Sequence, residues 1–134
     1  MPTIVQPDVV AVTIQALLAQ PLTATRVGTR VYGRVSGTTF PMWVVSLVDW
    51  DENRDAGGIA RVQISVWGNG PTEANEFEAF GHARTIAAVS RDLRGTYAAG
   101  RVSNSGHLMT VPNPDPDTGR AGYVVDLEIE TYPA

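Results

Sequence analysis

Apolar and polar positions change their period in the middle of the chain, where an alternating stretch is followed by a long segment with helical spacing. From Arg61 to Trp67 every second residue is apolar, with Val62, Ile64 and Val66 on one face. This alternation predicts a half-buried strand. Gly-Asn-Gly-Pro at positions 68–71 interrupts the pattern, so we expect the strand to turn directly into a helix.

The expected helix runs from Thr72 to Arg94, and Gly95 supplies a stop signal. Gly70 or Thr72 can cap its start, because Pro71 suits a first helical position. The residues expected to face the sheet recur at intervals of three or four: Phe77, Ala83, Ile86, Ala87, Ser90 and Leu93. This strand and helix form the nucleus of the predicted fold.

A first helix is predicted over residues 8–19, with Asp8 as its cap and Pro21 ending the run. Its many β-branched residues leave a strand as the alternative, although the Ala-Leu-Leu-Ala end favours a helix. Residues 22–29 are expected to be a polar connection and residues 30–35 a short strand. Met42 to Trp50 is apolar at nearly every position, which predicts the most buried strand, covered on both faces or packed against a neighbouring subunit.

The acidic segment Asp49 to Gly58 predicts an exposed, mobile hairpin turn that joins two antiparallel strands. Thr96 to Arg101 and His107 to Val111 are strand candidates separated by a turn-forming Ser-Asn-Ser-Gly, and residues 113–122 form a loop. Tyr123 to Tyr132 alternates as a last strand, with Val125, Leu127 and Ile129 inward and Asp126, Glu128 and Glu130 outward. Together these elements predict an α+β fold: a mainly antiparallel sheet with two helices packed on one face, in a single domain spanning residues 1–134.

Composition narrows the classes of function. The 134 residues are 43% hydrophobic, enough for one core without disulfides or metal, and the absence of cysteine excludes thiolate chemistry. No apolar run is long enough for a membrane span and the amino terminus lacks a secretion signal, so we expect a soluble protein. A net charge of -4 argues against a surface that grips nucleic acid as a whole.

The sequence offers little catalytic chemistry. His82 and His107 lack metal-binding spacing, which indicates structural or solvated roles, and the acidic turn lacks the ligand pattern of a calcium loop. The glycines before the long helix fit neither phosphate-loop pattern, and Glu73 would repel a phosphate there. We therefore expect no catalytic residue, cofactor or metal, although a triad assembled in space stays open.

Aromatic residues stand out instead. Trp43, Trp50 and Trp67 lie on predicted strands that look two-sided, and such residues serve as anchors in interfaces. The alternative is that they fill one core between sheet and helix. The apolar strand from Met42 to Trp50 favours assembly.

The order of these features resembles the tail-terminator (tail-completion) proteins of long-tailed bacteriophages. The resemblance covers most of the chain and rests on the amino-terminal helix, RVYGRVSGTTFPMWVVSLVD, ARVQISVWG before the long helix, and the final YVVDLEIE. It implies a non-enzymatic virion protein, assembled in the host cytoplasm, that forms a ring, usually a hexamer, at the head-proximal end of the tail tube. The ring would contact the major tail tube protein and a head-completion protein, and DNA would pass through its lumen without specific binding.

A closed ring needs two different complementary patches on each subunit. The candidates for subunit and partner contacts are Trp43, Trp50, Trp67, Asp51, Glu52, Asp55, Arg84, Arg91 and Arg94. An acidic lumen would fit the net charge, because a channel should not hold the DNA that traverses it. The competing hypotheses are another neck protein, such as a head-closure or connector-adaptor protein, and a small enzyme or ligand-binding domain.

Overall fold

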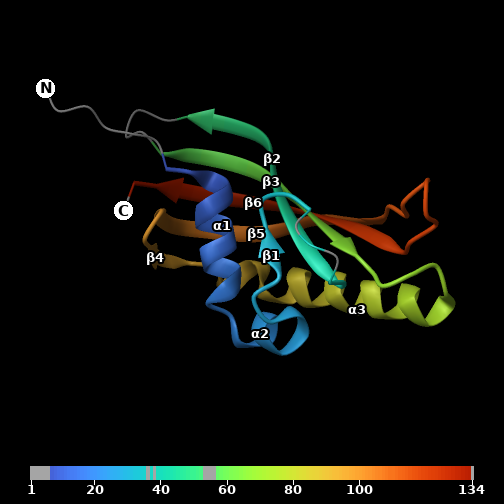
Figure 1. Ribbon diagram of the computed structural model, residues 1–134. Helices are drawn as coiled ribbons and strands as arrows, with labels where there is room; N and C mark the ends of the chain where they lie inside the picture. The colour runs from blue at the N-terminus through green and yellow to red at the C-terminus, as the bar shows by residue number, and fades with distance from the viewer. Residues whose placement is uncertain (1–6, 36, 38, 53–56, 134) are drawn as a thin grey trace, which may run out of the picture.

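A computed structural model describes residues 7–35, 37, 39–52 and 57–133 of the chain. Its strands form one sheet in the order β1-β2-β3-β6-β5-β4 (Figure 1). β1 pairs in parallel with β2, whereas the other described pairs are antiparallel. The α+β class and the mainly antiparallel sheet are therefore confirmed. In chain order the elements are α1 (Val9–Leu18), α2 (Pro21–Val27), β1 (Val31–Tyr32), β2 (Met42–Glu52), β3 (Gly58–Trp67), α3 (Glu73–Val89), the 3-10 helix η1 (Ser90–Asp92), β4 (Gly95–Tyr97), β5 (Gly100–Pro112) and β6 (Gly122–Tyr132).

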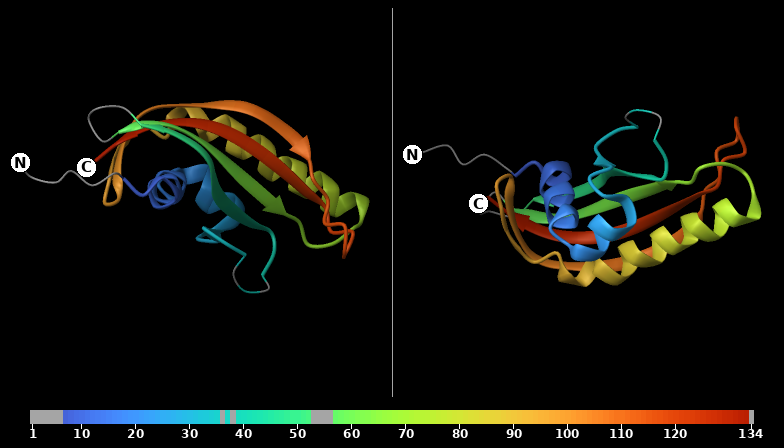
Figure 2. Two further views of the ribbon diagram at one scale, coloured as in Figure 1. Left: turned by 90° about the horizontal axis from the view of Figure 1, so that it is seen from above. Right: turned by 60° about the horizontal axis from the view of Figure 1, so that its bottom comes forward.

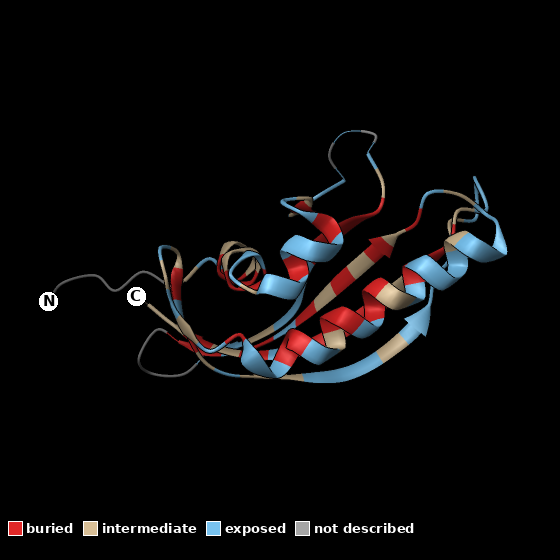
Figure 3. Cartoon of the chain, turned by 90° about the horizontal axis from the view of Figure 1, so that it is seen from below, coloured by how far each residue is buried: buried red, intermediate tan, exposed pale blue. Residues whose placement is uncertain are grey.

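The sheet bends into an open half-barrel, and the helices lie on its concave side (Figure 2). Alternate residues of the central strands point toward them and are completely buried, including Val62 and Ile64 of β3 and Leu127 and Ile129 of β6. Figure 3 shows the helices from outside, with buried positions on their inner sides. The core thus lies between the concave face and the helices, as the alternating pattern predicts.

Both long helices begin at side-chain caps. Asp8 accepts a hydrogen bond from the Ala11 backbone N–H at 3.1 Å, which confirms the first helix and its cap. Thr72 accepts from the Asn75 backbone N–H at 3.2 Å, so Thr72 rather than Gly70 caps α3.

The connection after the first helix contains a further helix, so the expectation of a polar connection over residues 22–29 is wrong. Pro21 does not simply end the first run, because it occupies the first turn of α2. Thr23 and Val27 of α2 are buried, and Val27 belongs to the core. Seven residues carry too little periodicity to predict such a helix, and its buried contacts stabilise it instead. The described chain therefore has three α-helices on the concave face rather than two.

The apolar strand β2 is not the most buried strand. Met42 to Val45 are buried, but Ser46 to Asp49 are exposed. Within the described part of the chain, the outer side of β2 has a strand neighbour at its first part, where Val31 and Tyr32 of β1 pair with Trp43 and Val44. The strand also continues to Glu52, so Asp49 and Asp51 belong to the strand and not to a turn.

The Ser-Asn-Ser-Gly segment at 103–106 is not a turn. It lies inside β5, a continuous strand from Gly100 to Pro112, and the reversal occurs after Tyr97 instead. The register with β6 shifts between Val102 and Asn104, so a β-bulge accommodates the polar residues.

At the start of the long helix, the buried residues differ from those that the sequence predicts. Phe77 is 68% exposed, so the prediction that it faces the sheet is wrong, whereas Ala83, Ile86 and Leu93 are fully buried. The α-helix ends at Val89 and η1 follows it. The small residue Ala79 lies where the first turns of α3 meet the core.

A buried pair joins α3 to the sheet. The Trp43 Nε1–H donates a hydrogen bond of 3.0 Å to Nδ1 of His82, and their rings meet edge to face. Burial, together with the charges of Arg26 and Arg30, lowers the pKa of His82 from 6.5 to about 4. His82 is therefore a neutral, structural residue, in agreement with the expectation.

Candidate functional site

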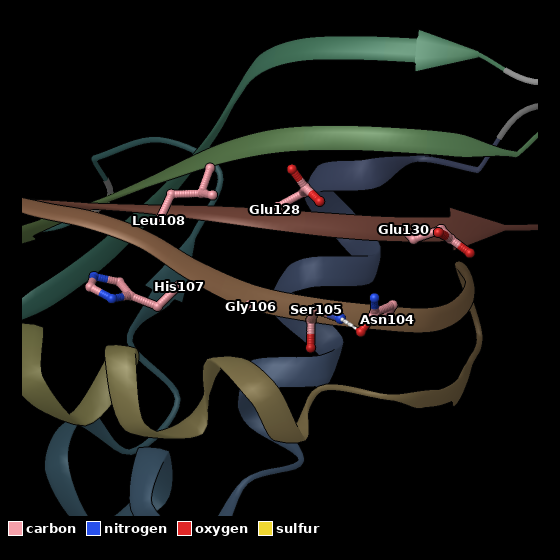
Figure 4. A pocket seen from close by; sticks show the side chains of 7 residues that line it. All are labelled: Asn104, Ser105, Gly106, His107, Leu108, Glu128 and Glu130. Carbon is pink, nitrogen blue, oxygen red and sulfur yellow. Dashed lines mark hydrogen bonds between the residues drawn. The ribbon is translucent and has the colours of Figure 1, made fainter.

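The helix-free face of the sheet carries a cluster of carboxylates. Strand register places these residues on the face away from the core, and Figure 4 shows Glu128 and Glu130 on the side of β6 away from α3. We name this cluster the acidic face; its members are Asp49, Asp51, Asp126, Glu128 and Glu130. It gathers five carboxylates from two strands that are separated by β3.

Arg61 of β3 lies among these carboxylates and neutralises one of them. Its guanidinium donates to Oδ2 of Asp126, which is almost completely buried. This hydrogen bond and the negative charge of Asp126 raise the pKa of Arg61. Glu130 accepts a hydrogen bond of 2.8 Å from the Ser103 hydroxyl, whereas Glu128 is exposed. The acidic face keeps a net negative charge.

A shallow hollow lies beside the acidic face. It has a volume of about 140 Å³ and is lined by Asn104, Ser105, Gly106, His107, Leu108, Glu128 and Glu130 (Figure 4). Ligand pockets usually occupy about 300 to 1,000 Å³. Among the described residues, no group of three His, Asp or Glu side chains is placed to hold a metal ion. The hollow therefore offers little room for a small-molecule substrate.

β2 and β5 have open edges beyond the short outermost strands β1 and β4. Among the described residues, no strand pairs with the outer side of β2 after Val44 or with the outer side of β5 after Val102. We call these the β2 edge (Ser46–Glu52) and the β5 edge (Ser103–Pro112). Open edges present unpaired backbone N–H and C=O groups to another chain.

Large apolar side chains are exposed along both edges. Leu47 and Val48 of the β2 edge are 45% and 50% exposed, and Leu108 and Met109 of the β5 edge are 49% and 47% exposed. The β5 residues were missed as site candidates by sequence reasoning. The sequence places them in an apolar strand candidate, which indicates a strand but not its place in the sheet. Only the pairing of β5 shows that they lie on an open edge.

The three tryptophans occupy different environments. Trp43 is completely buried in the subunit's own core, so it is not available to a partner and the interface expectation for it is wrong. Trp50 is half-buried, lies within the β2 edge and packs against the core. Trp67 is half-buried at the end of β3, in register with Met42. Trp50 and Trp67 stay candidates for contacts.

The predicted acidic turn is only partly described. Asp51 and Glu52 are exposed at the end of β2. Asp55 and the expected mobile tip lie outside the described residues. Asp51 and Glu52 thus belong to the β2 edge.

The three arginines expected on one helix face are spread over three segments. Arg84 is on α3, with its guanidinium carbon 6.0 Å from the centre of the Phe80 ring. Arg91 is in η1 and Arg94 follows it, because α3 ends sooner than predicted. All three are exposed. Arg94 and Arg101 line a second hollow, of about 320 Å³, where β4 meets β5.

The histidines and helices indicate no other kind of site. His82 is bound to Trp43, and Nε2 of His107 lies 2.8 Å from the hydroxyl of Thr110. No described helix is both long enough and apolar enough to cross a membrane.

Comparison with known proteins gives a likeness in fold. No protein-family model and no curated protein matches the chain. Among solved structures, a chain from the "Virion of native gene transfer agent (GTA) particle" is similar with a TM-score of 0.58 and 22% sequence identity. The likeness covers 91% of this chain and 92% of the other. The chain therefore shares its fold, nearly end to end, with a component of a gene transfer agent virion.

Proposed function

We propose that the protein is a structural component of a phage-like virion, and that it forms a closed ring at the head-proximal end of a tail tube. The observation that carries the proposal is the likeness to a chain of the gene transfer agent virion, because it extends over 91% of this chain. The order of sequence features, which resembles tail-terminator proteins, supports the position in the particle. In this role the ring ends growth of the tube and joins the tail to a head-completion protein.

The acidic face suits the wall of a channel for DNA. A ring repeats each carboxylate by symmetry, and the summed negative field repels the phosphates of passing DNA. The helix-free face of the sheet is free to line the lumen, because the helices and the core occupy the concave face. The charge distribution thus favours passage of DNA without binding.

A non-enzymatic role also agrees with the chemistry of the described residues. The buried histidine is neutral and bound to a tryptophan, and the hollow beside the acidic face is small. Exposed apolar side chains line both open edges of the sheet: Leu47, Val48, Leu108, Met109 and Val111. Such surfaces suit contacts with other protein chains.

Deletion of the gene for this protein from the genome that encodes the particle tests the proposal. Particles assembled without the protein should carry tail tubes of abnormal length and unattached heads, as seen by negative-stain electron microscopy. Complementation with the wild-type gene provides the control and should restore normal particles.

Two other outcomes have distinct meanings. Tubes of normal length that fail to join heads would indicate a different neck ring, such as a head-closure ring. Particles that assemble normally without the protein would contradict a structural role altogether.

A further inference from the structure

The two open edges are antiparallel to one another within the subunit. β2 is antiparallel to β3, β3 to β6, and β6 to β5, so β2 and β5 run in opposite directions. In a neighbouring copy whose sheet continues that of the first, each strand keeps nearly the same direction. Its β2 edge would therefore meet the β5 edge of the first copy as an antiparallel pair, and the sheet would continue across the contact.

We infer that copies of this chain join head to tail, with the β2 edge of one subunit paired with the β5 edge of the next. The inference rests on the proposed ring and names the surfaces that build it. The contact is heterologous: each subunit uses two different patches and leaves one of each free to bind a further copy. Repetition of this contact closes a ring when the rotation between neighbours divides a full turn and carries no rise along the axis.

The described strands place the two edges at the same height in the sheet. Register runs from Ser46 through Gln63 and Asp126 to Met109 at one end. At the other end it runs from Asp51 through Ile59 and Glu130 to Asn104. The open parts of β2 and β5 thus overlap over Ser46–Asp51 and Asn104–Met109, and each of these parts contains one register shift.

Apolar side chains on the two edges then come together. Leu47 lies at the height of His107, and Val48 and Leu108 each lie within one residue of that height; all four are exposed in the single subunit. Pairing would remove these apolar side chains from water, which stabilises a contact.

Charge on the two edges is also complementary. Asp51 and Glu52 end the β2 edge, whereas Arg94 and Arg101 line the hollow of about 320 Å³ at the matching end of β5. Glu52 lies at the height of Val102, next to Arg101. A second copy would place its two carboxylates at this arginine-lined hollow, so the charges favour unlike edges over like edges.

The edges also carry features that can block pairing. The register shifts between Leu47 and Asp49 in β2 and between His107 and Met109 in β5, and such bulges protect open edges in other proteins. Protected edges usually present charge at these positions. Here the residues at the shifts are Val48 and Leu108, which are apolar and about half exposed.

Two single substitutions test the head-to-tail contact. Val48→Glu disables the β2 edge and Leu108→Glu disables the β5 edge, and both change exposed side chains, so the subunit should stay folded by circular dichroism. Each variant alone should need at least about tenfold more protein to assemble than the wild type, measured by light scattering. Leu22→Glu is the matched control, because Leu22 is 52% exposed on α2, away from both edges.

Mixing the two variants distinguishes the geometry. In a head-to-tail contact the intact β2 edge of Leu108→Glu binds the intact β5 edge of Val48→Glu, so the mixture should give a one-to-one dimer that grows no further. A contact between two like edges would leave one variant assembling normally and the mixture without new complexes, which would overturn the inference.

A charge swap provides a second measurement. Asp51→Arg and Arg101→Glu should each weaken assembly about tenfold or more, and the double variant should recover most of it. If the wild type forms a ring and every variant forms a ring of the same mass at the same protein concentration, the edge contact is overturned and the proposed ring stays in place. A wild-type chain that stays monomeric at every concentration, and in the presence of tail tubes, would contradict the ring itself.

Discussion

The hydrogen bond between Trp43 and His82 joins two elements that are far apart in the sequence. Trp43 is in β2 and His82 is in α3, and both side chains are almost completely inaccessible. The bond requires an unprotonated Nδ1 as the acceptor. The two residues therefore fix the position of the long helix on the sheet and make that position sensitive to protonation.

Stability should fall on acidification because of His82. Its pKa is about 4 in the folded chain and 6.5 as the ordinary value, so the unfolded chain takes up the proton first as the pH falls. The stabilisation is complete above pH 6.5 and is lost progressively toward pH 4. Between pH 7 and pH 5 we expect a loss of about 1 to 2 kcal/mol, measured by urea unfolding. His82→Gln, which keeps an acceptor but does not titrate, should show a smaller loss over this range; an equal loss would assign the pH dependence to other groups.

Removal of the indole donor should also destabilise the subunit. Trp43→Phe leaves Nδ1 of His82 buried without its donor, which costs about 1 to 3 kcal/mol in the free energy of unfolding. Trp67→Phe is the control, since Trp67 is half-buried on the helix-free face. Equal effects of the two substitutions in urea unfolding would show that the hydrogen bond contributes little.

At the scale of elements, the cap of α3 has a separable contribution. Thr72 Oγ1 accepts hydrogen bonds from the backbone N–H and the side-chain amide of Asn75. Thr72→Ala should lower the free energy of unfolding by about 1 kcal/mol. Thr72→Ser keeps the oxygen and should retain most of the stability; a loss as large as that of the alanine variant would argue against capping.

Elements with a clear period could be predicted from the sequence, and the others could not. β3, β6, α1 and most of α3 follow apolar spacing of two or of three to four residues. α2 and the polar segment inside β5 have no such period, because partners elsewhere in the chain stabilise them. Phe77 fits the helical spacing but its side chain is 68% exposed.

The site was harder to predict than the fold, because an open edge is a property of strand pairing. Asp51 and Glu52 were proposed as contact residues because of their charge, and Trp50 because of its size. Leu108 and Met109 look like core residues in the sequence. Only the order of strands shows that nothing in the described chain covers them.

For the whole molecule, the charge of the helix-free face should decide how the assembled ring treats DNA. Asp49→Lys together with Glu128→Lys reverses two exposed members of the acidic face. The variant ring should bind double-stranded DNA at about 50 mM salt and release it near 200 mM, as electrostatic contacts do. A gel-shift assay compares it with the wild type, which should not bind.

A helix-side variant controls for overall charge. Glu76→Lys changes an exposed residue at the start of α3, on the opposite side of the sheet. The double variant Glu76→Lys with Glu78→Lys makes the same change in net charge away from the acidic face. Like the wild type, it should not bind DNA. Binding as strong as that of the face variant would show that net charge alone controls the affinity.

The position of Trp50 allows its intrinsic fluorescence to report assembly. Trp50 is a residue of the β2 edge whose indole packs against the core, and its Nε1 has no hydrogen-bond partner among the described residues. Trp43 is fully enclosed by contrast, so its emission should report unfolding and not association. A neighbouring strand on the β2 edge would change the polarity around Trp50, and the emission maximum should then shift with protein concentration. Label-free fluorescence on a dilution series can therefore follow the joining of subunits in real time.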